Sequence, residues 1–525
     1  MIDCSRNAVF NINGVKKWID ITSSLGYNCL MLYTEDTFTV ENNPYFGYLR
    51  GKYSVEEIKE IDAYAAKKGI ELMPCIQTLA HLNAIFRWPK YSQICDFNDI
   101  LLSGDEKTYE LIDDIFKSIS AMFTSKTVNI GMDEAHMLGL GKFLDKNGYQ
   151  NRSDILLVHL KKVSEIAEKY GLKLLMWGDM FAFLKNKGYS LDDVRSKIPH
   201  NVELIYWDYY SNSPKTYENN IANFNSIKEN TWFAGGLITW MGFVPHNDFS
   251  IKTAKVALES CQKMGVQDVF LTIWGDDGAE CSKFSVLPSL FYASEIAKGN
   301  SNLRNIKKKF KEWCGIPFDS FMLTDLPETP QDIKGRTANS SKHMFYNDCL
   351  LGIYDTTVKE SGHDSFKKCA RRLGRLKKNK QYGYIFETLQ ALCEVLAVKY
   401  DFGVRVRTAY QSNNLNELAA IEKECGVLIK KTERFYDAFE RQWMIENKPH
   451  GFDIQDLRIG GVIMRIKHLR KKLKAYLKGE LRHIAELEEN LLDAFGNGED
   501  YRPDDGFCKQ WKDSATVNVI YHNTL

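Results

Sequence analysis

Two neighbouring carboxylates are the residues whose types and spacing most directly suggest chemistry. Asp133 and Glu134 end or follow an apolar segment, 128–132. Adjacent carboxylates repel each other when both are ionised, so the pKa of one should rise toward the range of a general acid. Hydrolysis of a glycosidic bond needs such a proton donor and a group that stabilises the positive anomeric carbon. The pair could instead cap a following helix, because acids stabilise helix N-termini.

Tryptophans also gather where apolar segments end. Four of the ten tryptophans in the chain occupy such positions: Trp177, Trp207, Trp240 and Trp274. An indole face can pack against the C–H face of a sugar ring, while nearby carboxylates accept hydrogen bonds from its hydroxyls. These tryptophans are therefore candidates for binding a sugar, with the alternative that they only fill the mouth of a barrel.

The elements that would position these residues are short apolar segments, each followed by an amphipathic stretch. They are 2–4, 28–33, 70–76, 128–132, 172–177, 202–207, 232–238 and 268–274. Continuous apolar runs of this length are typical of strands in a parallel sheet that is covered on both faces. Eight strand–helix units in about 300 residues predict an α/β fold, a (β/α)8 TIM barrel, with chemistry at the carboxyl ends of the strands. A doubly wound open sheet is the alternative, but no GxGxxG motif follows the first segment.

A barrel would bring further polar residues to the same face. Arg6, Glu35, Asp36, His81 and Asp276 all follow predicted strands. Arg6 could hold sugar hydroxyls, or it could simply pair with Asp36. His81 could orient one of the two acids, or it could be a structural histidine.

The remainder of the chain predicts a different architecture. The strand–helix alternation stops near residue 318, and the proline-containing segment 326–331 is the expected linker. Periodic apolar residues then predict long helices near 343–373, 381–410, 414–446 and 455–495. Alternation in 516–521 predicts a short strand. We therefore expect a catalytic barrel over 1–318 and an all-α domain over 319–525, which could buttress the barrel or form a homo-oligomer.

Composition narrows the class of partner. The formal net charge is +1 and the mean hydropathy is −0.35. The overall charge and hydropathy therefore do not favour binding to nucleic acid or to a membrane. The basic run 367–380 is most simply a solvated helix face. The 12 cysteines form no CxxC pair, and no histidine cluster has metal-ligand spacing. We therefore expect a cytoplasmic protein with free thiols, no membrane span, no nucleic-acid partner and no metal.

Several motifs together resemble a known family of enzymes. The segments GMDEA, SRN, LMWGD, YWDYY and TIWGDDGAE are similar to those of glycoside hydrolase family 20, the β-N-acetylhexosaminidases, over about residues 1–300. The resemblance implies exo-acting removal of terminal β-linked GlcNAc or GalNAc from a glycan or glycoconjugate. It also implies retention of configuration through attack by the substrate's own 2-acetamido oxygen, without a metal or an organic cofactor. The small α/β domain that often precedes the barrel in this family is not expected here.

The same resemblance implies roles for single residues. Glu134 would be the general acid and base, and Asp133 would orient the acetamido group. Arg6 would hold O3 and O4 of the sugar. His81, with Glu35 or Asp36, would support Glu134.

The resemblance extends to the pocket walls. Trp177, Trp207 and Trp274 would enclose the acetamido group and the sugar face. Tyr209 would donate its hydroxyl to the acetamido oxygen, with Tyr206 and Tyr210 as alternatives. Asp276 stands where the family usually has a glutamate, which puts the sugar contacts at this position in doubt.

Two other functions stay open from the sequence. A conventional retaining β-glycosidase would use two protein carboxylates and would need no acetamido group on its substrate. A non-catalytic carbohydrate-binding protein would keep the aromatic residues, but it would not need the Asp133–Glu134 pair.

Overall fold

The first half of the chain folds into a closed parallel barrel. A computed structural model describes residues 1–181, 191–328, 340–358, 362–494 and 510–520. Its main sheet has eight strands: β1 (Ile2–Asp3), β2 (Cys29–Glu35), β3 (Glu71–Ile76), β6 (Thr127–Asn129), β7 (Lys173–Trp177), β8 (Val202–Trp207), β9 (Trp232–Gly236) and β10 (Val269–Thr272). Neighbours follow in chain order, and a parallel bridge between Ile2 and Ile273 joins the two ends. The predicted barrel is thus confirmed, and the open sheet is wrong.

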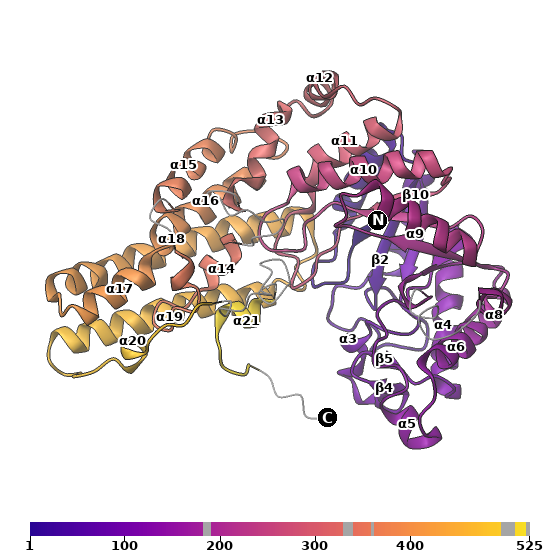
Figure 1. Ribbon diagram of the computed structural model, residues 1–525, viewed down its shortest axis with the longest axis horizontal. Helices are drawn as coiled ribbons and strands as arrows, with labels where there is room; N and C mark the ends of the chain where they lie inside the picture. Colours follow the sequence, from indigo (N-terminus) through magenta and orange to yellow (C-terminus); the bar gives the residue numbers. More distant parts are fainter. Residues whose placement is uncertain (182–190, 329–339, 359–361, 495–509, 521–525) are drawn as a thin grey trace.

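Helices surround the barrel, as Figure 1 shows. They are α1 (Ile12–Leu25), α2 (Val55–Lys67), α4 (Glu106–Met122), α6 (Arg152–Glu168), α8 (Leu191–Lys197), α9 (Pro214–Ile227), α10 (Asn247–Met264) and α11 (Leu287–Ala297). Ser54 and Glu57 form a capping box at the start of α2, which satisfies otherwise unpaired backbone donors. A short helix, α3 (Asn83–Phe86), and a hairpin of β4 (Cys95–Phe97) and β5 (Ile100–Leu101) lie between β3 and α4. Another short helix, α5 (Lys142–Asn147), precedes α6.

The segment that carries the acid pair leaves the sheet earlier than the apolar pattern predicts. The strand β6 ends at Asn129, and Gly131, Met132 and Glu134 all have positive φ. A side chain on residue 131 would collide with Gln77, so only glycine fits there. Non-glycine residues with positive φ are held in place only by their surroundings, and such strain is frequent at functional sites. The sharp turn therefore carries the two acids out of the strand direction at the mouth of the barrel.

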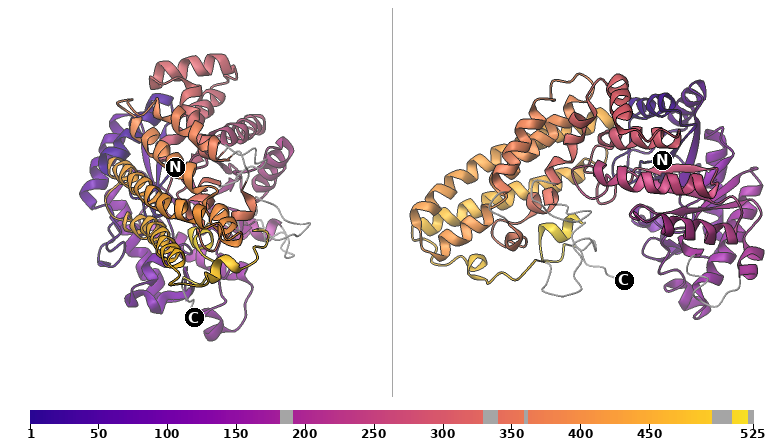
Figure 2. Two further views of the ribbon diagram at one scale, coloured as in Figure 1. Left: turned by 90° about the vertical axis from the view of Figure 1, so that its left-hand side faces the viewer. Right: turned by 45° about the horizontal axis from the view of Figure 1, so that its top comes forward.

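Beyond residue 302, the regular elements in the described part of the chain are all helical. They are α12 (Leu303–Cys314), α13 (Phe318–Phe321), α14 (Ser340–Tyr346), α15 (Gly362–Gly374), α16 (Gly383–Lys399), α17 (Phe402–Gln411), α18 (Leu415–Glu446), α19 (Asp453–Leu477), α20 (Ala485–Glu488) and α21 (Trp511–Ala515), with short 3-10 turns at Met322–Glu328 and Asp355–Thr357. In Figures 1 and 2 the long helices run side by side away from the barrel. The all-α character predicted for this region is confirmed.

Several predicted boundaries in this region are wrong. The expected helix 381–410 is two helices, α16 and α17, which separate at Tyr400 and Asp401. The expected helix 343–373 is also divided, into α14 and α15. The helix expected over 455–495 is α19, which ends at Leu477. The predicted strand at 516–521 is not formed by residues 516–520, and residue 521 lies outside the described part. Of the expected linker, residues 326–328 belong to a 3-10 turn, and residues 329–331 lie outside the described part of the chain. Apolar periodicity alone did not locate these breaks.

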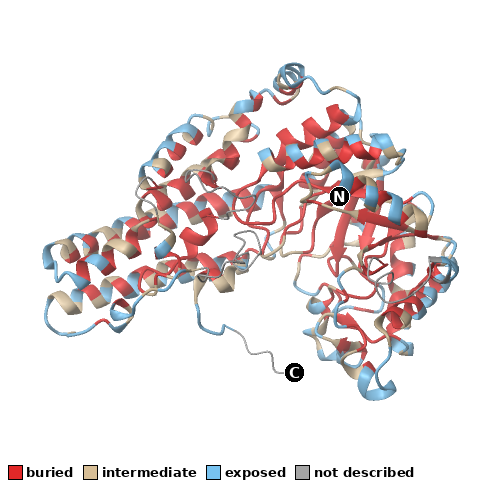
Figure 3. Cartoon of the chain, viewed as in Figure 1, coloured by how far each residue is buried: buried red, intermediate tan, exposed pale blue. Residues whose placement is uncertain are grey.

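An aromatic cluster joins the helical region to the barrel. Phe243, in the loop before α10, has its ring centroid 5.2 Å from Phe345 of α14 and 5.5 Å from Phe435 of α18. Figure 3 shows buried residues on both sides of this junction. The helical region therefore packs on the barrel through a shared hydrophobic core.

None of the described helices is long and apolar enough to span a membrane.

Candidate active site

A pocket of about 290 Å³ lies at the carboxyl ends of the barrel strands. All ten residues predicted to be catalytic or substrate-binding line it, and Tyr210 joins them: Arg6, His81, Asp133, Glu134, Trp177, Trp207, Tyr209, Tyr210, Trp240, Trp274 and Asp276. They come from the last residues of seven different strands or from the loops that follow, because parallel strands of a barrel end at one face. The two predicted supporting residues, Glu35 and Asp36, are not part of this lining.

Asp133 is held by hydrogen bonds from a neighbouring strand end. Gln77, just after β3, donates from Nε2 to Asp133 Oδ1 at 2.8 Å, and its Oε1 accepts from the backbone N–H of Met132 at 3.1 Å. Burial opposes ionisation of Asp133, but the His81 ring and the Gln77 amide outweigh it and lower its pKa below the usual value. Asp133 is therefore an anion with a fixed orientation.

Glu134 is the more accessible member of the pair. Its side chain is 49% exposed, against 14% for Asp133. Its backbone N–H donates to Asp179 Oδ2 at 3.0 Å, which fixes the strained turn. Burial, with the charge of Asp133, raises the pKa of Asp179 to about 7. The sequence leads us to expect a raised pKa within the Asp133–Glu134 pair. The pKa of Asp133 is lowered instead, and a raised pKa is found at Asp179, which lies beside the pair.

His81 lies beside both acids. Its Nε2 is 3.2 Å from Asp133 Oδ2 and 3.7 Å from Glu134 Oε2, without the alignment of a hydrogen bond, so the contact is mainly electrostatic. Burial would lower the pKa of His81, but the charge of Asp133 outweighs it and raises this pKa to about 9. The backbone N–H of His81 donates to Asp99 Oδ2 at 2.9 Å, where the chain has positive φ. His81 is thus a cation at neutral pH and stabilises the Asp133 anion.

Arg6 pairs with two acids, neither of which is Asp36. Its Nε donates to Glu35 Oε1 at 2.9 Å and its Nη1 to Asp276 Oδ1 at 2.6 Å. Asp36 instead accepts from Arg50 Nε at 2.9 Å, so the alternative that Arg6 pairs with Asp36 is wrong. Glu35 also accepts from the Tyr33 hydroxyl at 3.0 Å. The direct contacts of Glu35 and Asp36 are thus with Arg6, Tyr33 and Arg50. The His81 ring instead lies against the carboxylates of Asp133 and Glu134.

Aromatic rings form the remaining walls of the pocket. Trp177 and Trp274 meet at 5.9 Å between centroids, and Trp207 stacks on Tyr209 at 5.1 Å. The Trp274 indole N–H donates to the Tyr209 hydroxyl at 3.1 Å. The Tyr209 hydroxyl is the acceptor in this bond, so the bond does not use the hydroxyl proton.

The structure separates the three candidate tyrosines. The Tyr206 ring stacks on the ring of Phe224 of α9, with centroids 5.4 Å apart. Its hydroxyl donates to Asp208 Oδ2 at 3.1 Å. Tyr209 and Tyr210 both line the pocket. Tyr206 is therefore not a pocket residue, and the reason is the alternation of side chains along β8.

Two residues with direct contacts to the acid pair were not among the predicted site residues. Gln77 and Asp179 both stand just after strands, so their positions carried the same signal as those of the predicted residues. Neither belongs to an adjacent pair of acids or to an aromatic cluster, and their contacts to Asp133 and Glu134 depend on the fold.

The acids and His81 could also offer ligands to a cation. Their ligand atoms all lie within 4.8 Å of one another. One nitrogen and two carboxylates are a plausible donor set for a divalent metal. The raised pKa of His81 opposes this use, because a metal ligand must be the neutral imidazole.

Comparison with known proteins gives two family matches along the chain. The family model "Glycosyl hydrolase family 20, catalytic domain" matches residues 1–233, and "Glycoside Hydrolase 20C C-terminal domain" matches residues 319–503. Hexosaminidase D of Bos taurus is 26% identical over 200 residues, which are 35% of this chain and 55% of that protein. A β-hexosaminidase of Vibrio furnissii is 34% identical over 96 residues, 16% of each chain. The chain thus spans only about half the length, or less, of these curated relatives.

Solved structures give a weaker likeness. The β-N-acetylhexosaminidase of Bacteroides fragilis is 21% identical with a TM-score of 0.46, covering 60% of this chain and 70% of that chain. The two family matches together span most of this sequence, in the order that its barrel and helices follow. The chain therefore belongs to glycoside hydrolase family 20.

Proposed function

We propose that the protein is an exo-acting β-N-acetylhexosaminidase that removes terminal β-linked GlcNAc or GalNAc from a glycan or glycoconjugate. The observation that carries the proposal is the pocket itself, in which the adjacent acids face a cage of aromatic rings. Its volume of about 290 Å³ suits one sugar ring. Hexosaminidase activity in the named relatives supports the same conclusion.

The first step of the reaction uses Glu134 as an acid. The substrate's acetamido oxygen attacks the anomeric carbon while the bond to the leaving oxygen breaks, and Glu134 gives its proton to that oxygen. The bond electrons go to the leaving oxygen, and a cyclic oxazolinium forms. Since the acetamido oxygen serves as nucleophile, no protein nucleophile is needed.

The second step restores the enzyme. Glu134, now a carboxylate, takes a proton from water as the water oxygen bonds to the anomeric carbon. The bond to the acetamido oxygen breaks, and the amide is regenerated. Two inversions at one carbon give net retention.

Asp133 would stabilise the positive charge that develops on the acetamido nitrogen. Its lowered pKa and its bond from Gln77 support this role, because a preorganised anion stabilises developing positive charge most effectively. Tyr209 would donate its hydroxyl to the acetamido oxygen, and the tryptophans would enclose the group. Arg6 and Asp276 would bind hydroxyls at the far side of the ring, where they already pair at 2.6 Å.

The test compares two matched substrates, 4-nitrophenyl N-acetyl-β-glucosaminide and 4-nitrophenyl β-glucoside. We expect fast release of nitrophenol from the first and almost none from the second, equally with and without a chelator. Equal release from both would indicate a conventional two-carboxylate glycosidase. Release from neither would contradict the proposed activity, and loss with the chelator would assign a metal to the His81 cluster.

We further propose that the protein is cytoplasmic, that 1–318 and 319–525 form its two domains, and that the helical domain can mediate homo-oligomerisation. Eleven cysteines in the described residues are free, which supports a reducing compartment.

Leu457 and Met464 are exposed on α19, and Val427 is exposed on α18, which supports association through these helices.

A further inference from the structure

A groove lined mainly by cations lies on the helical region, between α18 and α19. It has a volume of about 600 Å³ and shares no lining residue with the sugar pocket. Figures 1 and 2 show these two helices running side by side away from the barrel. Six of the eleven lining residues are cations: Lys430, Lys467, Arg470, Lys471, Lys474 and Lys478. We call it the lysine groove.

The positive charge of the lysine groove is a local feature. Only two of its lining residues are acids, Glu433 and Glu480, so the lining has four more cations than acids. The whole chain, by contrast, has a formal net charge of +1. The groove therefore concentrates positive charge that the rest of the chain balances with acids.

Four of the lysines form a row along one face of α19. Lys467, Lys471, Lys474 and Lys478 follow one another at intervals of four, three and four residues, the spacing that places side chains on the same side of a helix. At 1.5 Å per residue the row spans about 16 Å. Lys430 lines the groove from α18, and all five side chains are exposed. A linear array of cations is suited to a linear ligand with several negative charges.

Three of these lysines are not neutralised by the chain. Lys430, Lys467 and Lys471 make no ion pair or side-chain hydrogen bond within the described part of the chain, whereas each of the other three cations of the lining lies within 3.6 Å of a glutamate. Like charges at helical spacing repel each other. A bound anion would relieve this repulsion.

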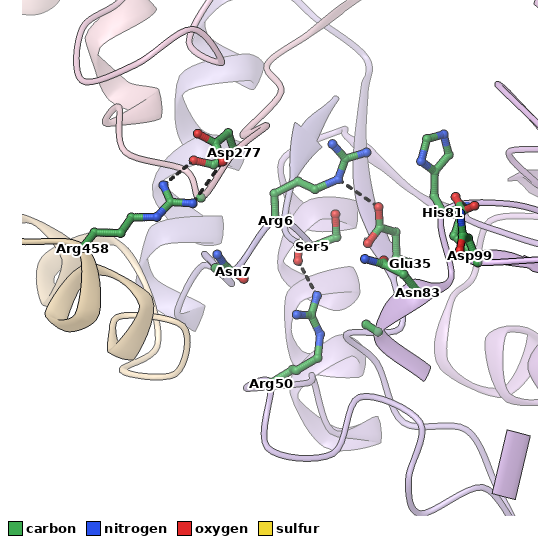
Figure 4. Close-up of a pocket in the computed structure, with 13 residues that line it drawn as sticks. Ser5, Arg6, Asn7, Glu35, Arg50, His81, Asn83, Asp99, Asp277 and Arg458 are labelled. Carbon is green, nitrogen blue, oxygen red and sulfur yellow. Dashed lines mark hydrogen bonds and ion pairs between the residues drawn. The ribbon is translucent and has the colours of Figure 1, made fainter. Parts of the chain in front are cut away.

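The cavity beside the sugar pocket shows the opposite arrangement. Figure 4 shows Arg6 bonded to Glu35 and Arg458 bonded to Asp277 in that cavity. These arginines already have acidic partners within the chain. The three free lysines of the lysine groove would obtain theirs from a ligand.

The other lining residues narrow the class of anion. None of the residues that line the groove is aromatic, and proteins that bind single-stranded nucleic acid stack its bases on aromatic rings. Its apolar lining consists of Gly426, Ile429 and Ala475, and Ile429 is only 8% exposed. Partner helices and membranes need larger apolar anchors than these. A second copy of the chain would bring the same positive charge to the groove, which opposes association there.

Glu433 adds an acceptor to the lining. Its exposed side chain makes no ion pair or hydrogen bond within the described part of the chain. A carboxylate accepts hydrogen bonds from hydroxyls but repels phosphates and other carboxylates. The groove therefore matches a ligand that carries hydroxyls as well as negative charges.

We propose that the lysine groove binds an acidic polysaccharide, a chain of hydroxylated sugars that carry sulfate or carboxylate groups. The lysines bind the acidic groups, and Glu433 accepts from a hydroxyl. The site is separate from the sugar pocket, so the inference does not depend on the proposed function. Binding, not turnover, is the property to measure.

Dextran sulfate is the probe, because it carries hydroxyls and sulfates but no N-acetylhexosamine that could enter the sugar pocket. Isothermal titration calorimetry gives its Kd for the whole protein, and uncharged dextran should not bind. We expect the triple variant Lys430→Gln, Lys467→Gln, Lys471→Gln to raise Kd by about tenfold, the scale of three exposed ion pairs. The dependence of Kd on salt should also become weaker, because fewer counterions are released on binding.

A second triple variant is the matched control. It replaces Lys126, Lys215 and Lys311 by glutamine, which changes the net charge equally. These lysines are exposed, lie outside the groove and make no ion pair within the described part of the chain. Its Kd should stay within about twofold of wild type. Neither triple variant should lower the melting temperature or the release of nitrophenol from the simple glycoside.

Glu433→Ala tests the kind of ligand by the direction of its effect. It should raise Kd for dextran sulfate by about threefold, because a hydrogen bond from a hydroxyl is lost. For polyglutamate, which has no hydroxyls, it should lower Kd, because a repelling charge is removed. Tighter binding of dextran sulfate by Glu433→Ala would contradict the contact with a hydroxyl.

The remaining outcomes overturn the inference. If dextran sulfate does not bind, or if both triple variants bind it equally, the groove is not a site for anions. If duplex DNA or vesicles that contain phosphatidylserine bind more tightly than dextran sulfate, and the groove lysines are needed, the ligand is a nucleic acid or a membrane instead. A fall in melting temperature confined to the groove variant would show that its lysines stabilise the fold.

Discussion

At the scale of single residues, the site separates its two acids by environment. Asp133 is half-buried against Gln77 and His81, while the side chain of Glu134 is half exposed on a strained turn. A fixed anion and an accessible acid are what substrate-assisted hydrolysis requires of neighbouring carboxylates. The two residues should therefore fail in different ways when they are changed.

We expect Glu134→Gln to lower kcat on a GlcNAc disaccharide by about two or more orders of magnitude, the usual contribution of general acid catalysis. The loss should be smaller on the nitrophenyl glycoside, whose leaving group needs less protonation. Asp133→Asn should slow both substrates similarly, because it affects formation of the oxazolinium. Steady-state kinetics on the two substrates measures this contrast, and near wild-type rates for Glu134→Gln on the disaccharide would contradict the acid assignment.

The charge on His81 predicts a pH dependence of stability. Its folded pKa of about 9 exceeds the unfolded value of 6.5, so its contribution is complete below 6.5 and is lost as pH rises through 9. The difference in unfolding free energy between wild type and His81→Gln should therefore shrink by about 3 kcal/mol between pH 6 and pH 10. Urea unfolding at both pH values measures it. A difference that does not change with pH would mean that His81 is neutral in the folded protein.

At the scale of elements, the helical region holds the loop that follows β10. Asp277 and Glu280 of this loop accept from Arg458 of α19 at 3.0 and 2.9 Å, and Lys342 of α14 lies 3.1 Å from Glu280. All four side chains are largely buried, so each charge depends on its partners. Asp276, which binds Arg6, is the residue next to this network. The helices α14 and α19 therefore position one side of the sugar pocket.

Replacing Arg458 tests this coupling. Arg458→Met removes one of the two cations that pair with Asp277 and Glu280 and leaves Lys342 as the other. We therefore expect KM to rise by about tenfold, a change of about 1.4 kcal/mol, with a smaller change in kcat. Arg465→Met is the control, because Arg465 lies on the same helix and pairs with buried Asp348 at 2.5 Å within the helical region. Both variants should lose thermal stability, but only the first should change KM. Equal KM values would show that the network has no part in substrate binding.

At the scale of the whole molecule, the barrel and the helices are joined by contacts from distant parts of the sequence. Besides the aromatic cluster, Lys448 donates from its backbone to Val9 and from Nζ to Glu57 at 2.7 Å. Phe435 is fully buried between Phe243, Phe345 and Phe439. Such a junction couples the stability of the two parts.

We therefore expect cooperative unfolding of the whole chain. Phe435→Ala should lower the free energy of unfolding by about 3–5 kcal/mol, the usual cost of a core phenylalanine. Tryptophan fluorescence, to which the rings at the barrel mouth contribute, and the circular dichroism of the helices should shift together on heating. A shift of the helical signal alone would show that the two parts unfold independently.

The sequence by itself determined the barrel and most of its site. Strand ends of a parallel barrel meet at one face, so apolar segments and the residues after them named nine pocket residues, and the family resemblance added Tyr209. The tertiary structure alone decided the partners: Arg6 pairs with Asp276, 270 residues away, and Asp36 turns to Arg50. It also decided that Gln77 orients Asp133 and that Tyr206 points away from the pocket. The physical reason is that sequence periodicity reports which face a residue occupies, whereas pairing depends on barrel closure and on the direction of each side chain.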